Sequence, residues 1–186
     1  AAFCIVRKIN KKNNKKIKVI NTLKVLTKSA EDVRKVSKAK FISITGSSGK
    51  TSLKELLAYS LNKLSPTSFS KYSFNNKYGV PLSLINIKKN HDFGVFEVGM
   101  DKAGEIDSLT KIIKPDLGVI TNISYAHIKN FKNLSKIASA KAEIMNNIVP
   151  GGTIVLNKDD SYFRFLENIA LKKKLKVISF SKNNVF

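Results

Sequence analysis

A β-rich run, a glycine turn and a leucine-striped segment follow one another between residues 41 and 61, and this order constrains the fold most. Phe41–Thr45 is rich in β-branched and aromatic residues, and Gly46–Gly49 supplies a tight turn. Leucines then recur at helical spacing from Leu53 to Leu61. The pattern predicts a strand, a glycine turn and a helix in that order.

The same alternation continues along the chain. Further β-rich runs cover residues 93–98, 117–123, 153–156 and 177–180, and helical patterns cover residues 22–38, 105–113, 134–148 and 161–173. Strands that alternate with helices predict an α/β fold of the P-loop type, with a mainly parallel sheet and helices on both faces. Before this region, the basic run from Lys8 to Lys18 predicts a solvated turn or hairpin.

Composition limits the class of protein. A chain of 186 residues with one cysteine has room for one ordinary domain core and no internal disulfide. It has no apolar run of membrane-spanning length and no signal-peptide pattern, so we expect a cytoplasmic protein without a membrane partner. We also expect a monomer. The chain starts without Met and its last strand reaches almost to the end, so we expect a segment of a larger protein.

The net charge of +21 leaves two interpretations open. One is a nucleic-acid-binding protein with a P-loop, because lysine neutralises phosphate. The other is that the protein does not bind nucleic acid. In that case the charge reflects a general bias toward lysine with the charges solvated on the surface, or it attracts an anionic small-molecule substrate. The only arginines are Arg7, Arg34 and Arg164. Proteins that recognise nucleic acids tend to use arginine, because its guanidinium group can make two hydrogen bonds to a base or a phosphate. We therefore favour the second interpretation and expect no nucleic-acid partner.

Residues Thr45–Ser52 (TGSSGKTS) carry the strongest functional signal. Glycines let successive backbone N–H groups point inward, and the following helix adds its positive N-terminal end, which together form a phosphate cradle. Lys50 would reach the β- and γ-phosphates, and the Thr51 hydroxyl would bind Mg²⁺. The strict motif requires glycine at position 44, where this chain has isoleucine, so the loop is a shortened variant. The alternative is an ordinary strand-to-helix turn.

Two side chains are candidates for a metal site at the same edge of the sheet. Glu97 ends the apolar run Phe93–Glu97, where open α/β sheets bind ligands, and carboxylate oxygens suit Mg²⁺. His127 follows the next predicted strand after a short loop. The alternatives are a solvent-facing Glu97 on an edge strand and a structural His127.

Lys141 lies on the apolar stripe of a predicted helix, with Ile137 and Ile144 on the same face. An ammonium in that position is costly, and burial lowers its pKa so that the neutral amine becomes available for chemistry. The alternative is a side chain whose stem covers apolar surface while its charge reaches water.

Five motifs in order resemble the central ATPase domain of the Mur ligase family. They are Thr45–Ser52 with Lys54 and Glu55, Phe74–Leu82 (FNNKYGVPL), Glu97–Gly99 with Gly104–Ile106, Thr121–His127, and Ala140–Ile144. Within the family, the asparagine pair and the Gly-Glu-Ile stretch favour the branch that joins D-alanyl-D-alanine to UDP-N-acetylmuramoyl-tripeptide. The resemblance runs from about residue 18 to the end.

The resemblance implies an ATP-dependent amide ligase of peptidoglycan precursor synthesis. ATP would phosphorylate the terminal carboxylate of UDP-N-acetylmuramoyl-tripeptide, and the amine of D-alanyl-D-alanine would attack the acyl phosphate. It also implies the following residue roles. Catalysis would involve Lys50, His127 and Lys141; ATP would contact Gly46, Ser47, Ser48, Gly49, Lys50, Thr51, Ser52, Asn75, Asn76 and Asn157; Mg²⁺ would be held by Thr51, Glu97, His127 and Lys141. In the family this lysine is typically carbamylated by CO₂, which would give Lys141 an anionic oxygen.

The resemblance also predicts the domain organisation. Residues 1–38 would be the tail of an N-terminal UDP-substrate domain, residues 39–186 an incomplete central ATP-binding domain, and the C-terminal domain would be absent. We therefore expect the 186-residue chain alone to have little or no ligase activity. The alternatives are another Mur ligase or a folylpolyglutamate synthase-like ligase with a different amine acceptor, and a segment that folds without binding nucleotide or metal.

Overall fold

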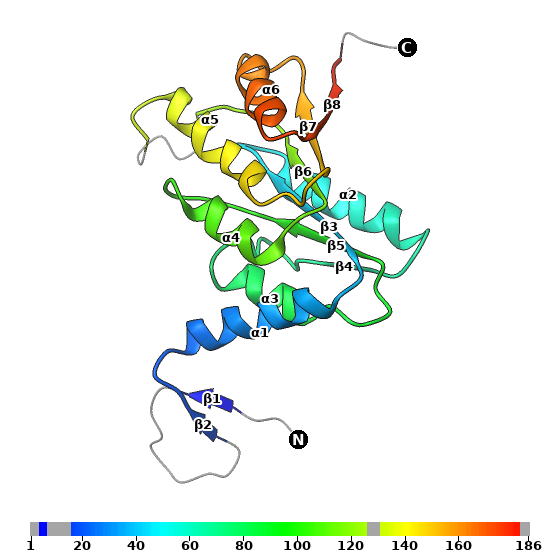
Figure 1. The fold of residues 1–186 in the computed structure, drawn as a ribbon, viewed down its shortest axis with the longest axis vertical. Helices are drawn as coiled ribbons and strands as arrows, with labels where there is room; N and C mark the ends of the chain where they lie inside the picture. Colours follow the sequence, from blue (N-terminus) through cyan, green and yellow to red (C-terminus); the bar gives the residue numbers. More distant parts are fainter. Residues whose placement is uncertain (1–3, 7–15, 126–130, 183–186) are drawn as a thin grey trace.

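The computed structural model describes residues 4–6, 16–125 and 131–182. At one end of the molecule, β1 (Cys4–Val6) pairs with β2 (Lys16–Lys18), and α1 (Thr22–Val36) follows (Figure 1). The two strands run parallel, with Ile5 opposite Ile17. Of the expected turn or hairpin, the hairpin is therefore wrong, because a hairpin would pair the strands antiparallel. Residues 7–15 lie outside the described ranges, so the turn stays a prediction.

Six parallel strands form the main sheet. In spatial order they are β4 (Thr67–Phe69), β5 (Phe93–Glu97), β3 (Lys40–Thr45), β6 (Leu117–Ile120), β7 (Thr153–Asn157) and β8 (Lys176–Phe180). Every neighbouring pair is parallel. The predicted parallel α/β sheet is confirmed, and β4 is a strand that the sequence pattern did not indicate.

Helices cover both faces of this sheet, but unequally. The helices are α2 (Lys50–Asn62), α3 (Gly79–Ile85), α4 (Glu105–Ile113), α5 (Leu134–Ala142), the 3₁₀ turn η2 (Glu143–Asn146) and α6 (Phe163–Lys172). Only the β3–α2–β4 connection runs toward the β4 edge, and the later crossovers all run the other way. Since such crossovers are right-handed, α2 covers one face and α3 to α6 cover the other (Figure 1).

The core follows this division. Under α2, the fully buried Ile44 and Val95 pack with Leu53 and Leu57. The opposite face holds the larger cluster, in which the rings of Phe41 and Phe96 stack with centroids 5.7 Å apart. Neighbouring residues of β3 therefore serve different cores, as the two-residue period of a strand requires.

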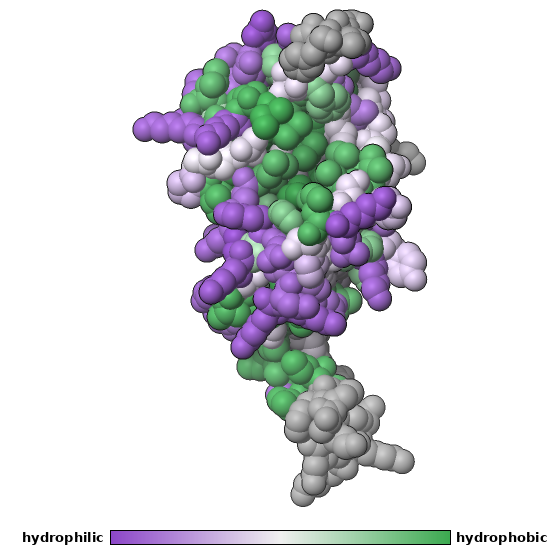
Figure 2. Space-filling model, turned by 90° about the vertical axis from the view of Figure 1, so that its right-hand side faces the viewer, coloured by the Kyte–Doolittle hydropathy of each residue, from purple (hydrophilic) through white to green (hydrophobic). Residues whose placement is uncertain are grey.

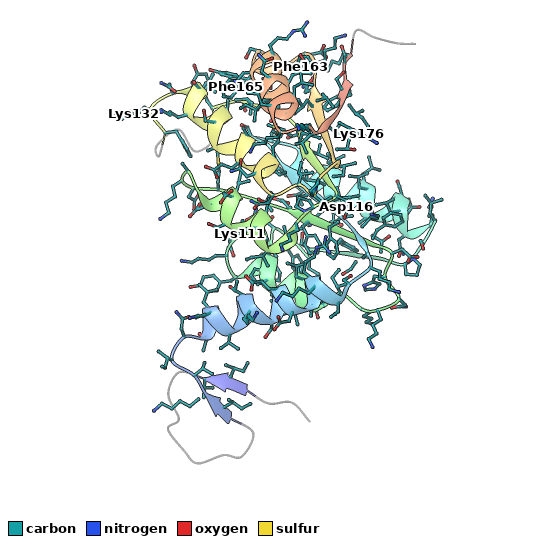
Figure 3. All side chains as sticks on the ribbon, in the orientation of Figure 1. Lys111, Asp116, Lys132, Phe163, Phe165 and Lys176 are labelled. Carbon is teal, nitrogen blue, oxygen red and sulfur yellow. The ribbon has the colours of Figure 1, made fainter. Side chains whose placement is uncertain are left out.

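The last two elements show how amphipathic spacing separates core from surface. On α6, Phe163 is buried whereas Phe165 is 38% exposed (Figure 3). The outermost strand β8 exposes Ile178 and Phe180. Hydrophobic side chains gather in the upper part of the face shown in Figure 2, above a belt of hydrophilic ones. Apolar surface is thus left exposed on the side of the sheet where β8 lies.

Helix α1 packs against α3 and α4, and Arg34 fastens it there. The Arg34 guanidinium donates to the backbone oxygens of Ile113 and Lys114 and lies 4.2 Å from the centre of the Phe41 ring. At the other end of the helix, the Asn21 side chain accepts from Lys24 N at 3.0 Å. The predicted helix is confirmed, while the domain boundary at residue 38 stays a prediction.

The strand order determines where a ligand site can lie. β3 is central, and the chain reaches β5 on one side of it and β6 on the other. Open α/β sheets bind ligands at the carboxyl ends of the strands, beside such a reversal of strand order. At the amino ends of the strands, Asp116 instead stabilises the sheet by accepting from Lys40 Nζ and from Phe41 N, each at 2.9 Å (Figure 3).

Candidate nucleotide-binding site

The turn after β3 has the backbone of an anion cradle. Gly46 and Gly49 adopt φ angles of 149° and 76°, which residues with a Cβ rarely adopt. The first N–H groups of any helix lack partners within the helix, and the N-cap of α2, Gly49, has no side chain that could accept from them. A Cβ built on Gly49 would meet no heavy atom within 4 Å. The turn is therefore open on the side to which this Cβ would point, and a helix N-terminus is a favourable place for an anion.

The loop after β6 braces this turn. The Asn122 side-chain oxygen accepts from Ser47 N at 3.1 Å and from Ser48 N at 3.0 Å. Thr121 Oγ1 donates to Ser48 O at 2.6 Å. The predicted strand 117–123 ends at Ile120, because the residues after it turn to hold the cradle. The sequence motif included these residues, but no local signal indicated this contact.

Lys50 lies at the first position of α2 and leans back over the turn. Its Nζ donates to Gly46 O at 2.9 Å. This places a positive charge beside the open end of the helix, where electrostatic attraction to an anion adds to that of the N–H groups.

Thr51 and Glu97 are in direct contact at the carboxyl ends of the strands. Thr51 Oγ1 donates to Glu97 Oε2 at 2.7 Å, and Asn75 Nδ2 donates to Glu97 Oε1 at 2.8 Å. Glu97 is 2% exposed and ends a strand flanked by β4 and β3. The alternative of a solvent-facing glutamate on an edge strand is therefore wrong. The pair offers a hydroxyl and a carboxylate oxygen, which are ligands that Mg²⁺ prefers.

Lys141 is buried near the same loop. It is 2% exposed and lies among buried residues such as Ile137 and Ile144, so the alternative of a charge that reaches water is wrong. Burial lowers the pKa of Lys141 to about 7, and the charge of Lys50 contributes to the same shift. The two ammonium groups therefore lie within electrostatic reach of each other, and much of the Lys141 amine is neutral near pH 7.

The remaining predicted residues have different placements. His127 lies outside the described residues. Asn76 accepts with its side chain from the backbone N–H groups of Tyr78 and Gly79, each at 3.0 Å, and so holds the turn that leads into α3. Asn157 ends β7 and accepts from Asp159 N at 3.0 Å. These two asparagines have structural contacts, and their roles toward a nucleotide stay predictions. Ser52 lies in the first turn of α2.

Lys54 is a site-supporting residue that the sequence analysis included in a motif without a role. It is fully buried, and its Nζ donates to the backbone oxygen of Tyr72 and pairs with Glu55 at 3.0 Å. It therefore ties α2 to the segment that carries Asn75. A lysine in a helix of a lysine-rich chain gives no sequence signal for this burial.

A cavity in the described part of the chain lies away from this site. A hollow of about 480 Å³ lies between the edge strand β4 and α3, and none of the residues Thr45–Ser52 lines it. Among the described residues, no three His, Cys, Asp or Glu side chains gather as a metal cage.

In the described ranges, none of the helices is both long and apolar enough to cross a membrane.

Fold and loop together place the chain among the P-loop α/β domains. The sequence profile described as "Mur ligase middle domain" matches residues 44–186. The chain belongs to the Mur ligase family.

Similar proteins are found among curated sequences and among solved structures. The chain is 42% identical over 145 residues to the UDP-N-acetylmuramoyl-tripeptide–D-alanyl-D-alanine ligase of Buchnera aphidicola subsp. Acyrthosiphon pisum, an alignment that covers 78% of this chain and 32% of that protein. A crystal structure of MurF from Acinetobacter baumannii superposes with a TM-score of 0.88 at 32% identity and covers 97% of this chain and 39% of that one. The structure of MurF from Thermotoga maritima in complex with ADP superposes with a TM-score of 0.84 at 27% identity. It covers 99% of this chain and 42% of that one.

The chain thus spans about a third of the length of the curated relatives that it matches, at 32% and 36% for two of them.

Proposed function

We propose that the protein to which this chain belongs is an ATP-dependent amide ligase that joins D-alanyl-D-alanine to UDP-N-acetylmuramoyl-tripeptide. The contact that carries the proposal is the hydrogen bond from Thr51 to Glu97, because it joins the phosphate turn to a buried carboxylate. The MurF names of the relatives support the choice of substrates. We also propose that the protein is a cytoplasmic monomer and that residues 1–38 and 39–186 belong to different domains.

The nucleotide would be bound by the residues that form the turn. Backbone N–H groups at the start of α2 would hold its phosphates, and Lys50 would move from Gly46 O to the terminal phosphate. Mg²⁺, held by Thr51, Glu97 and the nucleotide, would neutralise charge between the phosphates. The donor set fits, since both protein ligands are oxygen atoms that already lie 2.7 Å apart.

The chemistry requires two anions to approach each other. A carboxylate oxygen of the tripeptide would bond to the γ-phosphorus, and ADP would leave. The amine of D-alanyl-D-alanine would then bond to the acyl carbon, and phosphate would leave while the nitrogen loses a proton. Fixed positive charge at Lys50 would stabilise both transition states by electrostatic attraction.

Lys141 would contribute by changing its charge. Its neutral amine can attack CO₂, and loss of a proton then leaves an N-carboxylated side chain with two oxygens and a negative charge. Because the group is buried and near Lys50, this anion would replace a repulsive charge pair by an attractive one. His127 would complete this part of the site.

The experiment compares amine acceptors in the whole protein. With UDP-N-acetylmuramoyl-tripeptide and MgATP, D-alanyl-D-alanine should support phosphate release, and single amino acids should not. Turnover with a single amino acid, or with glutamate on a folate, would instead support a sibling ligase. Micromolar affinity for random duplex DNA at physiological salt, with a steep salt dependence, would support the nucleic-acid alternative.

A second measurement uses the 186-residue chain alone. MgATP should raise its midpoint of thermal unfolding, because a ligand that binds only the folded state stabilises it. No shift at millimolar MgATP would mean that the segment folds without binding nucleotide.

A further inference from the structure

The start of α4 is capped by a residue from another helix. The N-cap position is Gly104, which has no side chain to accept from the free N–H groups. Glu143, which follows α5 and begins η2, supplies both acceptors: its Oε1 accepts from Gly104 N at 2.7 Å, and its Oε2 accepts from Asp107 N at 3.2 Å. These are the N–H groups of the N-cap and third helical positions, which a capping box normally satisfies from within the helix.

The residues of α4 itself are engaged elsewhere. The Glu105 carboxylate accepts from the backbone N–H groups of Asp101 and Lys102 and closes the loop before the helix. The Asp107 carboxylate accepts from Asn146 Nδ2 at 2.7 Å and from Asn147 Nδ2 at 3.1 Å. Glu143 is thus the carboxylate that the structure directs at the two amides.

The position of this contact in the chain connects it to the site. Glu97 and Gly104 are joined by the short loop between β5 and α4, and the backbone of Gly99 in that loop donates to Asn75 O at 2.8 Å. Glu143 follows Lys141 by two residues, directly after the last turn of α5. One carboxylate therefore fastens the segment that follows Glu97 to the segment that carries Lys141.

We propose that Glu143 is a positioning residue that holds Lys141 against the Glu97 side of the site by capping α4 from outside. This inference rests on the proposed role of Lys141. Charge strengthens the contact, because a carboxylate at a helix N-terminus is stabilised both by charge-assisted hydrogen bonds and by the helix dipole. Neither effect requires Glu143 to touch a substrate.

The test uses Glu143→Gln, which keeps the shape of the side chain. Its amide has one oxygen acceptor in place of two and no charge, so one of the two amides loses its partner. The matched control is Asn146→Ala, which removes a hydrogen bond to the same helix at Asp107 and leaves Glu143 intact. Glu143→Asp is shorter by one methylene and still charged. It should keep part of the wild-type behaviour that Glu143→Gln loses.

Two readouts are measured in the 186-residue chain. The first is hydrogen exchange at the Gly104 and Asp107 amides, which should be at least about tenfold faster in Glu143→Gln than in the wild type. The second is the carbamate signal of Lys141 in ¹³C-labelled bicarbonate, which should fall at least about tenfold in the same variant. Asn146→Ala should leave both close to wild type.

Three results from the variants would overturn the proposal. In one, Glu143→Gln changes neither readout. In another, Asn146→Ala lowers the carbamate signal as much as Glu143→Gln does, which would make the contact ordinary packing. In the third, exchange accelerates while the carbamate signal persists. A wild-type chain without any carbamate signal would disprove the proposed role of Lys141, and with it the positioning of that residue, while exchange at Gly104 and Asp107 would still report whether the cap exists.

Discussion

Gly46 and Thr121 approach so closely that the turn after β3 has no room for a side chain. A Cβ built on Gly46 would lie 1.8 Å from Thr121 Oγ1, and the φ angle of Gly46 is itself 149°. Gly46→Ala should therefore lower the free energy of unfolding by about 2–5 kcal/mol, because overpacking adds to backbone strain. Urea denaturation of the purified chain measures this difference.

Gly151→Ala is the control for backbone strain alone. Gly151 has a φ of 74°, and its Cβ would meet no atom within 4 Å. The expected cost is about 1–2 kcal/mol. Equal losses in the two variants would contradict the close contact at Gly46.

Asn122→Ala should loosen the phosphate turn. The variant removes the side-chain acceptor of the Ser48 amide, and a lost hydrogen bond costs about 0.5–1.5 kcal/mol. The Ser47 amide keeps the backbone oxygen of Asn122 at 3.0 Å. Hydrogen exchange should therefore accelerate at Ser48 more than at Ser47. Asn62→Ala is a suitable control because Asn62 accepts from Thr67 N at the far end of α2. Unchanged exchange at Ser48 in Asn122→Ala would show that the brace does not form in solution.

The stability of the chain should depend on pH through Lys141. Its pKa in the folded protein is about 7 against an ordinary value of 10.5, so between these values the unfolded chain holds a proton that the folded chain has released. Stability from this group therefore rises with pH over that interval, by at most about 1.4 kcal/mol per pH unit, and is lowest below pH 7. Urea denaturation in bicarbonate-free buffer at pH 6 to 9 measures the slope.

Lys141→Met removes this titration and serves as the comparison. Its stability should depend less on pH than that of the wild type, and should exceed it most at pH 6, where the wild type buries a charge. Parallel curves for the two proteins would mean that Lys141 keeps an ordinary pKa and reaches water.

In the whole protein, Lys141→Ala should abolish ligation, and added bicarbonate or a small carboxylate should restore part of it. The reason is that the proposed anionic oxygen would then come from solution rather than from the side chain. Phosphate release with D-alanyl-D-alanine measures the activity, and the exposed Lys136→Ala is the control. Near-normal turnover of Lys141→Ala would refute its proposed role.

The sequence predicted features that arise from local patterns. Periodicity located β3, β5 and their helices, and it placed Lys141 on a buried stripe because a helix face is a local property. The sheet then brought Thr51 and Glu97 together because strand ends of a parallel sheet share one edge. The short elements β4 and α3 were missed, since Thr67–Phe69 and Gly79–Ile85 are too short for a clear period.

Other features depend on contacts between distant segments. Asn122 braces a turn that lies 74 residues earlier, and Glu143 caps a helix 39 residues before it. Asparagine and glutamate are common surface residues, so nothing in their own neighbourhood indicates these partners. The structure of the segment around His127 is outside the described residues, and its place in the site stays a prediction.

The central claim is that the turn before Lys50 binds a nucleotide's phosphates with Mg²⁺ held at Glu97. Calorimetric titration of ADP into the 186-residue chain, with and without Mg²⁺, tests it most directly in the wild type and in Glu97→Gln. The wild type should bind at least about tenfold more tightly with Mg²⁺, and Glu97→Gln, which keeps the side-chain shape, should lose that difference and still fold. Binding that is equally strong in both proteins and indifferent to Mg²⁺, or no binding at all, would contradict it.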